Sequence, residues 1–311
     1  MNSSFSNTDA RRRSLSPSEK SDLAQHRPIR WLSDLAVDWS LIVGFFWLFD
    51  ATGRPWPLLP LFGILIGSRQ HALSLLGHDG AHMSALPNRY MNDRLTEWFC
   101  GWPLGTTLDG GYRDWHFEHH RALGTPADPE LAYRGESSTY SGTITRAHII
   151  ARFVQDSLGM GASGLWAFVR EILPEKRSSY AGPVLFYALF LVTSLYLDAT
   201  WVFIVWCWSI VGGFWAVFRM RTWFEHVGLE NHGPFGSHRI SANPVIRFLF
   251  FPHNTHCHFE HHLHPQVPQS NLPELRKRMQ ARDPLLKPVV QPFGELLEQF
   301  EDIEESYAKA V

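Results

Sequence analysis

The sequence has little of what stabilises a small secreted domain or binds nucleic acid. It contains only three cysteines in 311 residues, Cys100, Cys207 and Cys257, with no CxxC pair, so it predicts neither a disulfide framework nor a thiolate zinc site. A formal net charge of −2 gives no electrostatic reason to expect a nucleic-acid partner. There is no nucleotide-binding glycine fingerprint and no internal repeat. Charged residues make up only 19% of the chain and apolar residues 45%, which excludes a disordered or fibrous protein.

Apolar residues form four runs that are arranged as two pairs. A short polar turn separates the two runs of each pair. The runs cover residues 35–49, 57–67, 183–197 and 201–218. Spanning a bilayer takes about 20 mainly apolar residues, with roughly 17 as the lower end. The fourth run meets this length, the first and third need flanking residues, and Arg69 and His71 weaken the second. The runs predict an all-α membrane protein with about four transmembrane helices. The alternative is four buried core helices of a soluble protein.

The basic residues predict how these helices are oriented. Of the 28 Lys and Arg residues, only Arg54 and Arg69 lie in the two hairpins themselves. The others precede residue 31 or fall within 78–182 and 219–311. Because short cytosolic segments are enriched in Lys and Arg, we expect the N-terminus, the C-terminus and the region between the hairpins on the cytosolic side of a multi-pass protein.

Composition divides the chain into three segments. Residues 1–30 are rich in Ser, Asn and Arg, which predicts a disordered basic tail. No apolar stretch with a cleavage site follows it, so it is not a secretory signal. Residues 31–280 form the predicted membrane domain, with a helical cytosolic cap. Residues 281–311 form a C-terminal amphipathic tail, in which 295–310 are expected to make an acidic helix.

Histidine is the residue in excess, and most of the 17 histidines are clustered. Residues 78–82 read HxxxH, and residues 116–120 and 258–262 both read HxxHH, with His226 between them. Residues i, i+3 and i+4 share one face of a helix, so each HxxHH group can hold one metal and reach a second. Nine nitrogen donors exceed the four ligands of one tetrahedral zinc ion, so the sequence predicts two metal ions. Imidazole suits Fe, Zn, Cu and Ni, so the ligand type alone does not identify the element. The predicted ligands are His78, His82, His116, His119, His120, His226, His258, His261 and His262.

All four histidine groups fall on the same side of the membrane in this topology, beyond the ends of the apolar runs. Five of the remaining histidines are expected to be surface or core residues: His26, His71, His148, His232 and His238. His253, His256 and His264 lie beside the third group and are expected to support the ligands or to have no role there.

Three carboxylates adjoin the histidine groups: Asp79, Glu118 and Glu260. Neighbouring helix positions point about 100° apart, so these acids should not bind the same metal as the histidine beside them. We expect them to orient a ligand imidazole through its other nitrogen. The alternative is that they are plain acids on a helix surface.

The order and context of the histidine groups resemble the membrane fatty acid desaturase and hydroxylase superfamily over roughly residues 35–275. The resemblance extends from Gly77 through Asn92-Asp93, from His116 through Asp128-Pro129, and from Asn254 through Pro268. It implies a non-haem diiron centre, with two Fe held by the nine histidines, and O2-dependent attack on an unactivated C–H bond. His226 matches the additional ligand that some members carry.

The resemblance predicts a desaturase that introduces a double bond into an acyl chain or related lipid. A hydroxylase or ketolase acting on a carotenoid, alkane or other lipid has the same histidine groups and stays open. Electrons are expected from a separate ferredoxin, rubredoxin or cytochrome. A His-rich metal transporter is disfavoured because transporters place ligands near the bilayer midplane. A zinc protease is disfavoured by the missing HExxH, and a soluble histidine-rich module would need the four apolar runs as core.

Overall fold

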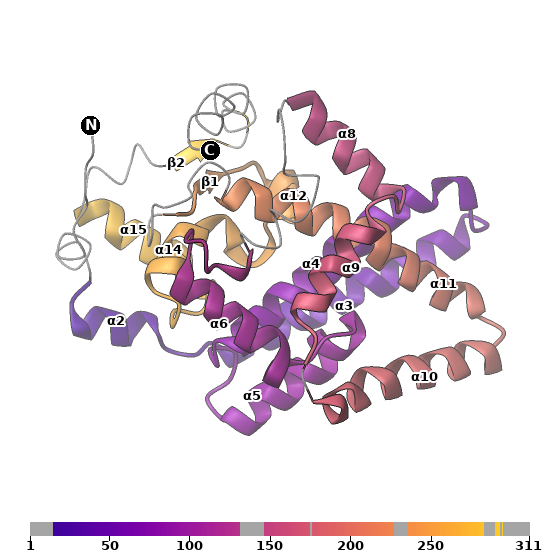
Figure 1. Cartoon of the computed structure of the whole chain (residues 1–311), viewed down its shortest axis with the longest axis horizontal. Coiled ribbons are helices and arrows are strands. Elements are labelled where there is room, and N and C mark those ends of the chain that lie inside the picture. Colours follow the sequence, from indigo (N-terminus) through magenta and orange to yellow (C-terminus); the bar gives the residue numbers. More distant parts are fainter. Residues whose placement is uncertain are drawn as a thin grey trace.

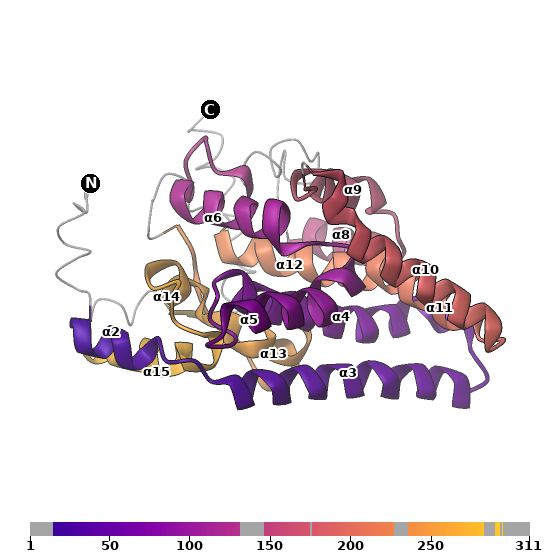
Figure 2. The ribbon, with the colours of Figure 1, turned by 90° about the horizontal axis from the view of Figure 1, so that it is seen from below.

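Most of the described chain is helical, as the sequence predicts (Figures 1 and 2). Besides turns and loops, it contains one parallel pair of three-residue strands, β1 (Arg239–Ser241) and β2 (Val290–Pro292), in which Arg239 is opposite Val290. The structure is a computed structural model that describes residues 15–130, 146–174, 176–226, 236–282, 290–292 and 294.

The four apolar runs lie mainly in long helices. The first lies in α3 (Pro28–Ala51), the second in the 3-10 segment η1 (Trp56–Leu58) and α4 (Leu59–Ala81), and the third mainly in α10 (Ala181–Tyr196). The fourth passes without a break through α11 (Thr200–Ser209), the π-helical segment η6 (Ile210–Phe214) and α12 (Trp215–His226).

Three helical stretches among the described residues are long and apolar enough to cross a membrane: Pro17–Ala51, Ser178–Tyr196 and Thr200–His226. The α10 side chains of Val184, Leu189 and Val192 are each more than half exposed. Such a wide apolar surface is unfavourable in water and matches contact with lipid. The protein is therefore a membrane protein. By length and composition, the candidate spans number three rather than about four.

Helix α4 differs from the candidate spans because protein surrounds it. It lies between α3 and α12 (Figure 2), and nearly all of it from Phe62 onward is buried. Glycines let α4 and η6 approach at backbone distance, since a Cβ on Gly213 would collide with the carbonyl of Gly63, and one on Gly67 with the backbone of Gly213. The π-turn of η6 accommodates this contact inside an otherwise continuous helix.

The charged residue that weakens the second apolar run is paired inside the protein. The Arg69 guanidinium lies 3.1 Å from the Asp38 carboxylate of α3, and both side chains are buried. His253 Nε2 contacts the other Asp38 oxygen at 2.7 Å. A buried charge is tolerated when it is paired and hydrogen-bonded. These contacts tie α3 and α4 to the segment that precedes the third histidine group.

The N-terminal segment departs from the predicted tail. Residues 17–23 form helix α2 (Pro17–Leu23), which begins with a capping box between Ser16 and Glu19. Leu15 and Leu23 are buried in one cluster with Leu272 and Leu275 of α15 (Leu272–Arg282). Burial of these two leucines supplies the stabilisation that the polar composition does not suggest. Residues 1–14 and the expected helix over 295–310 lie outside the described residues.

Shorter helices cover the long helices, and most of them gather as a cap at the end where the histidine-bearing segments converge (Figure 1). Between the hairpins these are α5 (Arg89–Thr96), η2 (Glu97–Gly101), η3 (Trp102–Leu104), η4 (Leu108–Tyr112), α6 (Arg113–Ala122), α8 (Arg146–Ser157), α9 (Ala162–Glu171) and η5 (Arg177–Tyr180). After α12 come α13 (Pro244–Phe250), η8 (Pro252–Cys257), α14 (His258–Leu263), η9 (Gln269–Asn271) and α15.

Candidate metal centre

Each histidine group lies at a helix end or on a short helix that a polar contact holds in place. His78 is in the last turn of α4, and His82 caps that helix. The Arg113 guanidinium of α6 donates to the α4 carbonyls of Gly80 and Ala81 at 3.1 and 3.0 Å. A cation at a helix C-terminus satisfies its last carbonyls and its dipole. Arg113 thereby joins the first histidine group to the second.

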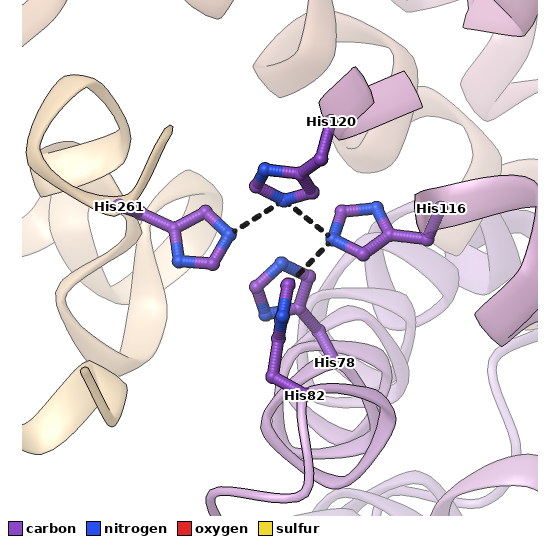
Figure 3. Close-up of side chains that lie close together, drawn as sticks. All are labelled: His78, His82, His116, His120 and His261. Carbon is purple, nitrogen blue, oxygen red and sulfur yellow. Dashed lines mark hydrogen bonds between the residues drawn. The ribbon is translucent and has the colours of Figure 1, made fainter. Parts of the chain in front are cut away.

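Five histidines form the first cluster, which is called the five-histidine cluster below (Figure 3). Its members are His78, His82, His116, His120 and His261, and one nitrogen from each lies within 4.8 Å of the others. The Nε2 atom of His116 is 2.9 Å from that of His82 and 3.0 Å from that of His120. His120 Nε2 is in turn 3.0 Å from His261 Nε2.

The other four predicted ligands form a second cluster, the four-histidine cluster. It contains His119, His226, His258 and His262, all buried, with nitrogens within the same 4.8 Å limit. His258 Nε2 lies 3.0 Å from His226 Nε2 and 2.9 Å from His262 Nε2. The structure thus brings all nine histidines together and divides them five and four.

Helical spacing explains why two elements contribute to both clusters. In α6, the i, i+4 pair His116 and His120 enters the five-histidine cluster, while His119 enters the other. In α14 the division is reversed, because His258 and His262 enter the four-histidine cluster and His261 the other.

The nitrogens of the two clusters suit metal ions better than hydrogen bonds to one another. A neutral imidazole has a single N–H, so three or more converging Nε2 atoms cannot all be satisfied mutually. In two members of the four-histidine cluster the second nitrogen is already engaged. His119 Nδ1 donates to Asp128 at 2.8 Å, and His226 Nδ1 donates to the Gly236 carbonyl at 2.8 Å. This tautomer leaves the Nε2 lone pair for a metal.

Burial keeps the imidazoles in the neutral form that binds metal. Burial, with the neighbouring Arg113, lowers the pKa of His82 to about 3. Burial and the surrounding imidazoles lower the pKa of His120 to about 2. The same causes hold the pKa values of His258 and His261 well below the usual range. Desolvation disfavours the charged imidazolium, so these nitrogens have their lone pairs at neutral pH.

Two carboxylates that the sequence did not single out lie beside the four-histidine cluster. Glu130 Oε2 is 3.3 Å from His119 Nε2 and 3.8 Å from His226 Nε2. Glu225 Oε2 is 3.4 Å from His258 Nε2. Both glutamates are buried. Asp128, which orients His119, was also missed, because a carboxylate in a loop eight residues past the histidine group has no periodic signal.

The three acids expected to orient imidazoles have three different environments. Asp79 accepts from the backbone of Gln269, whose side-chain amide lies 3.2 Å from His78 Nδ1, so its contact with a histidine is indirect. Glu118 is exposed and pairs with Arg121, as the surface alternative expected. Glu260 is fully buried between Arg239 and Arg276, where it joins β1 and α15 to α14.

The remaining histidines of the described chain lie outside both clusters. His253 pairs with Asp38, and His26 contacts the Met83 carbonyl at 3.0 Å. His256 and His264 flank α14 without joining a cluster. His71, His148 and His238 also stand apart, and His232 lies outside the described residues.

One cavity of about 130 Å³ borders both clusters. His78 and His116 of the five-histidine cluster and His119 and His258 of the four-histidine cluster line it. Most of the other walls are apolar or aromatic, with side chains from α4, α6, α9, η6 and α12. A reacting carbon in this cavity would therefore be close to both clusters and shielded from water.

Comparison with known proteins agrees with this geometry. The profile of the fatty acid desaturase family matches residues 54–293. The chain belongs to this family. The match includes every cluster histidine, and membership makes the protein an oxidoreductase.

The relatives of this desaturase-family protein carry out more than one reaction. It is 27% identical over 252 residues to a beta-carotene ketolase of Paracoccus sp. (strain PC1), covering 77% of this chain and 88% of the relative. It is 26% identical over 268 residues to the dihydrorhizobitoxine desaturase of Bradyrhizobium elkanii, covering 78% and 73%. A second ketolase, from Paracoccus sp. (strain N81106 / MBIC 01143), is 28% identical over 255 residues, covering 77% and 87%.

Proposed function

We propose that this protein is an O2-dependent desaturase that introduces a double bond into an acyl chain or related lipid, with two irons bound by the nine histidines. The observation that carries the proposal is the apolar cavity bordered by both histidine clusters. A substrate carbon in that cavity would be close to both clusters.

The histidines fit the pair of irons that family membership implies. His78, His82, His116, His120 and His261 would hold one iron, and His119, His226, His258 and His262 the other. Imidazole nitrogen is a suitable ligand for iron. When bound, the two irons supply the activation of O2 needed to oxidise an unactivated C–H bond.

Glu130 would complete the four-histidine site as an oxygen ligand. Its Oε2 is 3.3 Å from His119 Nε2, a spacing comparable to the 2.9 and 3.0 Å between the cluster's own nitrogens. Two ligand atoms, each about 2.1 Å from one metal, are separated by a similar distance. Each iron would then have five protein ligands, one set entirely imidazole and the other four imidazoles and a carboxylate.

The chain's other contributions are orientation and exclusion of water. Asp128 holds His119 in one tautomer, and Arg113 holds α6 against the end of α4. The apolar walls hold a hydrocarbon substrate and keep bulk water from the reacting carbon. Loss of two hydrogens, with two electrons and two protons supplied from outside, reduces O2 to two waters and leaves an alkene.

The electrons would come from a separate ferredoxin, rubredoxin or cytochrome that docks on the cap. We further propose that the cap, both termini and the metal centre are cytosolic, supported by the shortage of Lys and Arg in the hairpin turns.

Hydroxylation or ketolation is the second candidate reaction. The cavity of about 130 Å³ is close to the roughly 150 Å³ that holds a single benzene ring, so it can take a compact, ring-sized group. Two of the relatives described above are named beta-carotene ketolases. In hydroxylation one atom of O2 enters the product and the other becomes water, with two electrons and two protons supplied from outside. A ketone takes two such rounds at the same carbon, followed by loss of one water.

Product analysis separates the two reactions. The full chain would be produced with iron in cells that contain both fatty acids and beta-carotene, and their lipids compared by mass spectrometry with those of cells producing the His119→Ala variant. An acyl product lacking two hydrogens supports the desaturase. An oxygenated ring supports the second candidate, and the absence of both products in iron-loaded, folded protein would sink both.

A further inference from the structure

The cavity beside the histidine clusters is apolar except for a few buried polar groups, and these point to a feature of the substrate. Arg221 of α12 lines the cavity and is only 8% exposed. Its Nη2 lies 3.1 Å from Glu225. Its Nε–H has no hydrogen-bond acceptor among the described residues. A buried donor without an acceptor is unfavourable, so this N–H suggests an acceptor on a ligand.

A second donor on the same cavity shares this property. Trp115 of α6 lines it. The indole N–H of Trp115 is buried and has no partner in the described part of the chain. Buried polar groups in folded proteins are nearly always hydrogen-bonded. Two such donors on one largely apolar cavity therefore indicate a site for a polar atom.

The charges around the cavity indicate whether the acceptor atom on the ligand is charged or neutral. The Arg221 charge is already balanced by Glu225. A carboxylate or phosphate would therefore find no unpaired cation in Arg221. A neutral carbonyl or hydroxyl oxygen would accept the Nε–H bond without repulsion.

We propose that the cavity recognises a compact, ring-sized end of the substrate that carries a neutral oxygen acceptor, with Arg221 as the main donor and Trp115 as the second. The inference rests on the proposed function, since it concerns the substrate of that same site. It assigns Arg221 to substrate selection. A site built to hydrogen-bond an oxygen rejects the analogue lacking it by as much as roughly 10⁴-fold.

The test compares two rings of the same size, cyclohexanone and methylenecyclohexane, which differ by an oxygen in place of a CH2 group. Binding to the full-length protein in detergent is measured without reductant, so that no turnover occurs, and corrected for uptake by empty micelles. Wild-type protein should prefer the ketone. Arg221→Met should reduce that preference by about tenfold or more, and Trp115→Phe by a smaller factor.

Arg219→Met is the matched control, because Arg219 is a buried arginine on the same helix that pairs with Asp156 and does not line this cavity. It should keep the wild-type preference. Equal binding of both rings by wild-type protein would overturn the inference, as would an unchanged preference in Arg221→Met. If that variant fails to fold, an unchanged preference in Trp115→Phe decides against it. Failure of the proposed function would appear separately, as absence of iron or product.

Discussion

The chain contains the pentapeptide HFEHH twice, at residues 116–120 and 258–262, and the two copies are used in opposite ways. The first gives its outer histidines to the five-histidine cluster and its fourth residue to the other. The second copy does the reverse. Glu118 of the first is exposed, whereas Glu260 of the second is fully buried between two arginines. Identical local sequence therefore determines which side chains share a helix face, and the surroundings determine what each one contacts.

The largest expected effect comes from removing the fourth residue of each copy. His119→Ala should weaken metal binding at the four-histidine cluster, and His261→Ala at the five-histidine cluster, because each removes one ligand from a different site. Both should abolish turnover and reduce bound iron from two per chain toward one. Metal analysis of purified protein measures this, with His148→Ala, outside both clusters, as control. Full activity in either variant would contradict the assignment.

The next effect concerns the glutamates at the centre of the two copies. Glu260→Ala would leave Arg239 and Arg276 without their buried carboxylate, which costs about 3–5 kcal/mol in stability. Glu118→Ala removes an exposed pair with Arg121 and should change stability by less than about 0.5 kcal/mol. Thermal unfolding in detergent compares the two variants. Equal destabilisation of the two variants would show that the burial of Glu260 does not contribute to stability.

A third prediction tests whether a carboxylate distinguishes the two metal sites. Glu130→Gln should lower metal affinity at the four-histidine cluster at least tenfold, because an amide is a weaker ligand than a carboxylate. The five-histidine cluster should bind as before. Chelator competition measures both affinities, with Glu118→Gln as a matched change at an exposed glutamate. Equal weakening of both sites would argue for a general electrostatic effect instead.

The smallest expected effect concerns the second nitrogen of the fourth histidine in each copy. His119 Nδ1 is bonded to Asp128, whereas His261 Nδ1 has no partner among the described residues. Asp128→Asn should lower metal affinity only about 10-fold, at the four-histidine cluster alone. This is the low end of the range typical of lost outer-shell support, because the amide oxygen can still accept the Nδ1–H bond. The same chelator competition detects it, and an affinity unchanged at both clusters would remove Asp128 from the metal site.

The sequence by itself determined the helical class, the four apolar helices and the nine histidines that converge. These follow from apolar run length and i, i+3, i+4 spacing, which are properties of a local helix. It marked the second run as the weakest through Arg69 and His71, but it did not show that protein surrounds α4, because the pairing of Arg69 with Asp38 joins residues from two separate helices.

Only the tertiary structure decided which cluster each histidine enters and which acids adjoin them. His261 contacts His120 across 141 positions of sequence, and Glu130 reaches His119 and His226 from a segment without helical periodicity. The cavity that both clusters border, and the unpartnered donor of Arg221 within it, likewise depend on how separate helices pack. Local spacing sets the direction of a side chain on its own helix, whereas its partners depend on long-range packing.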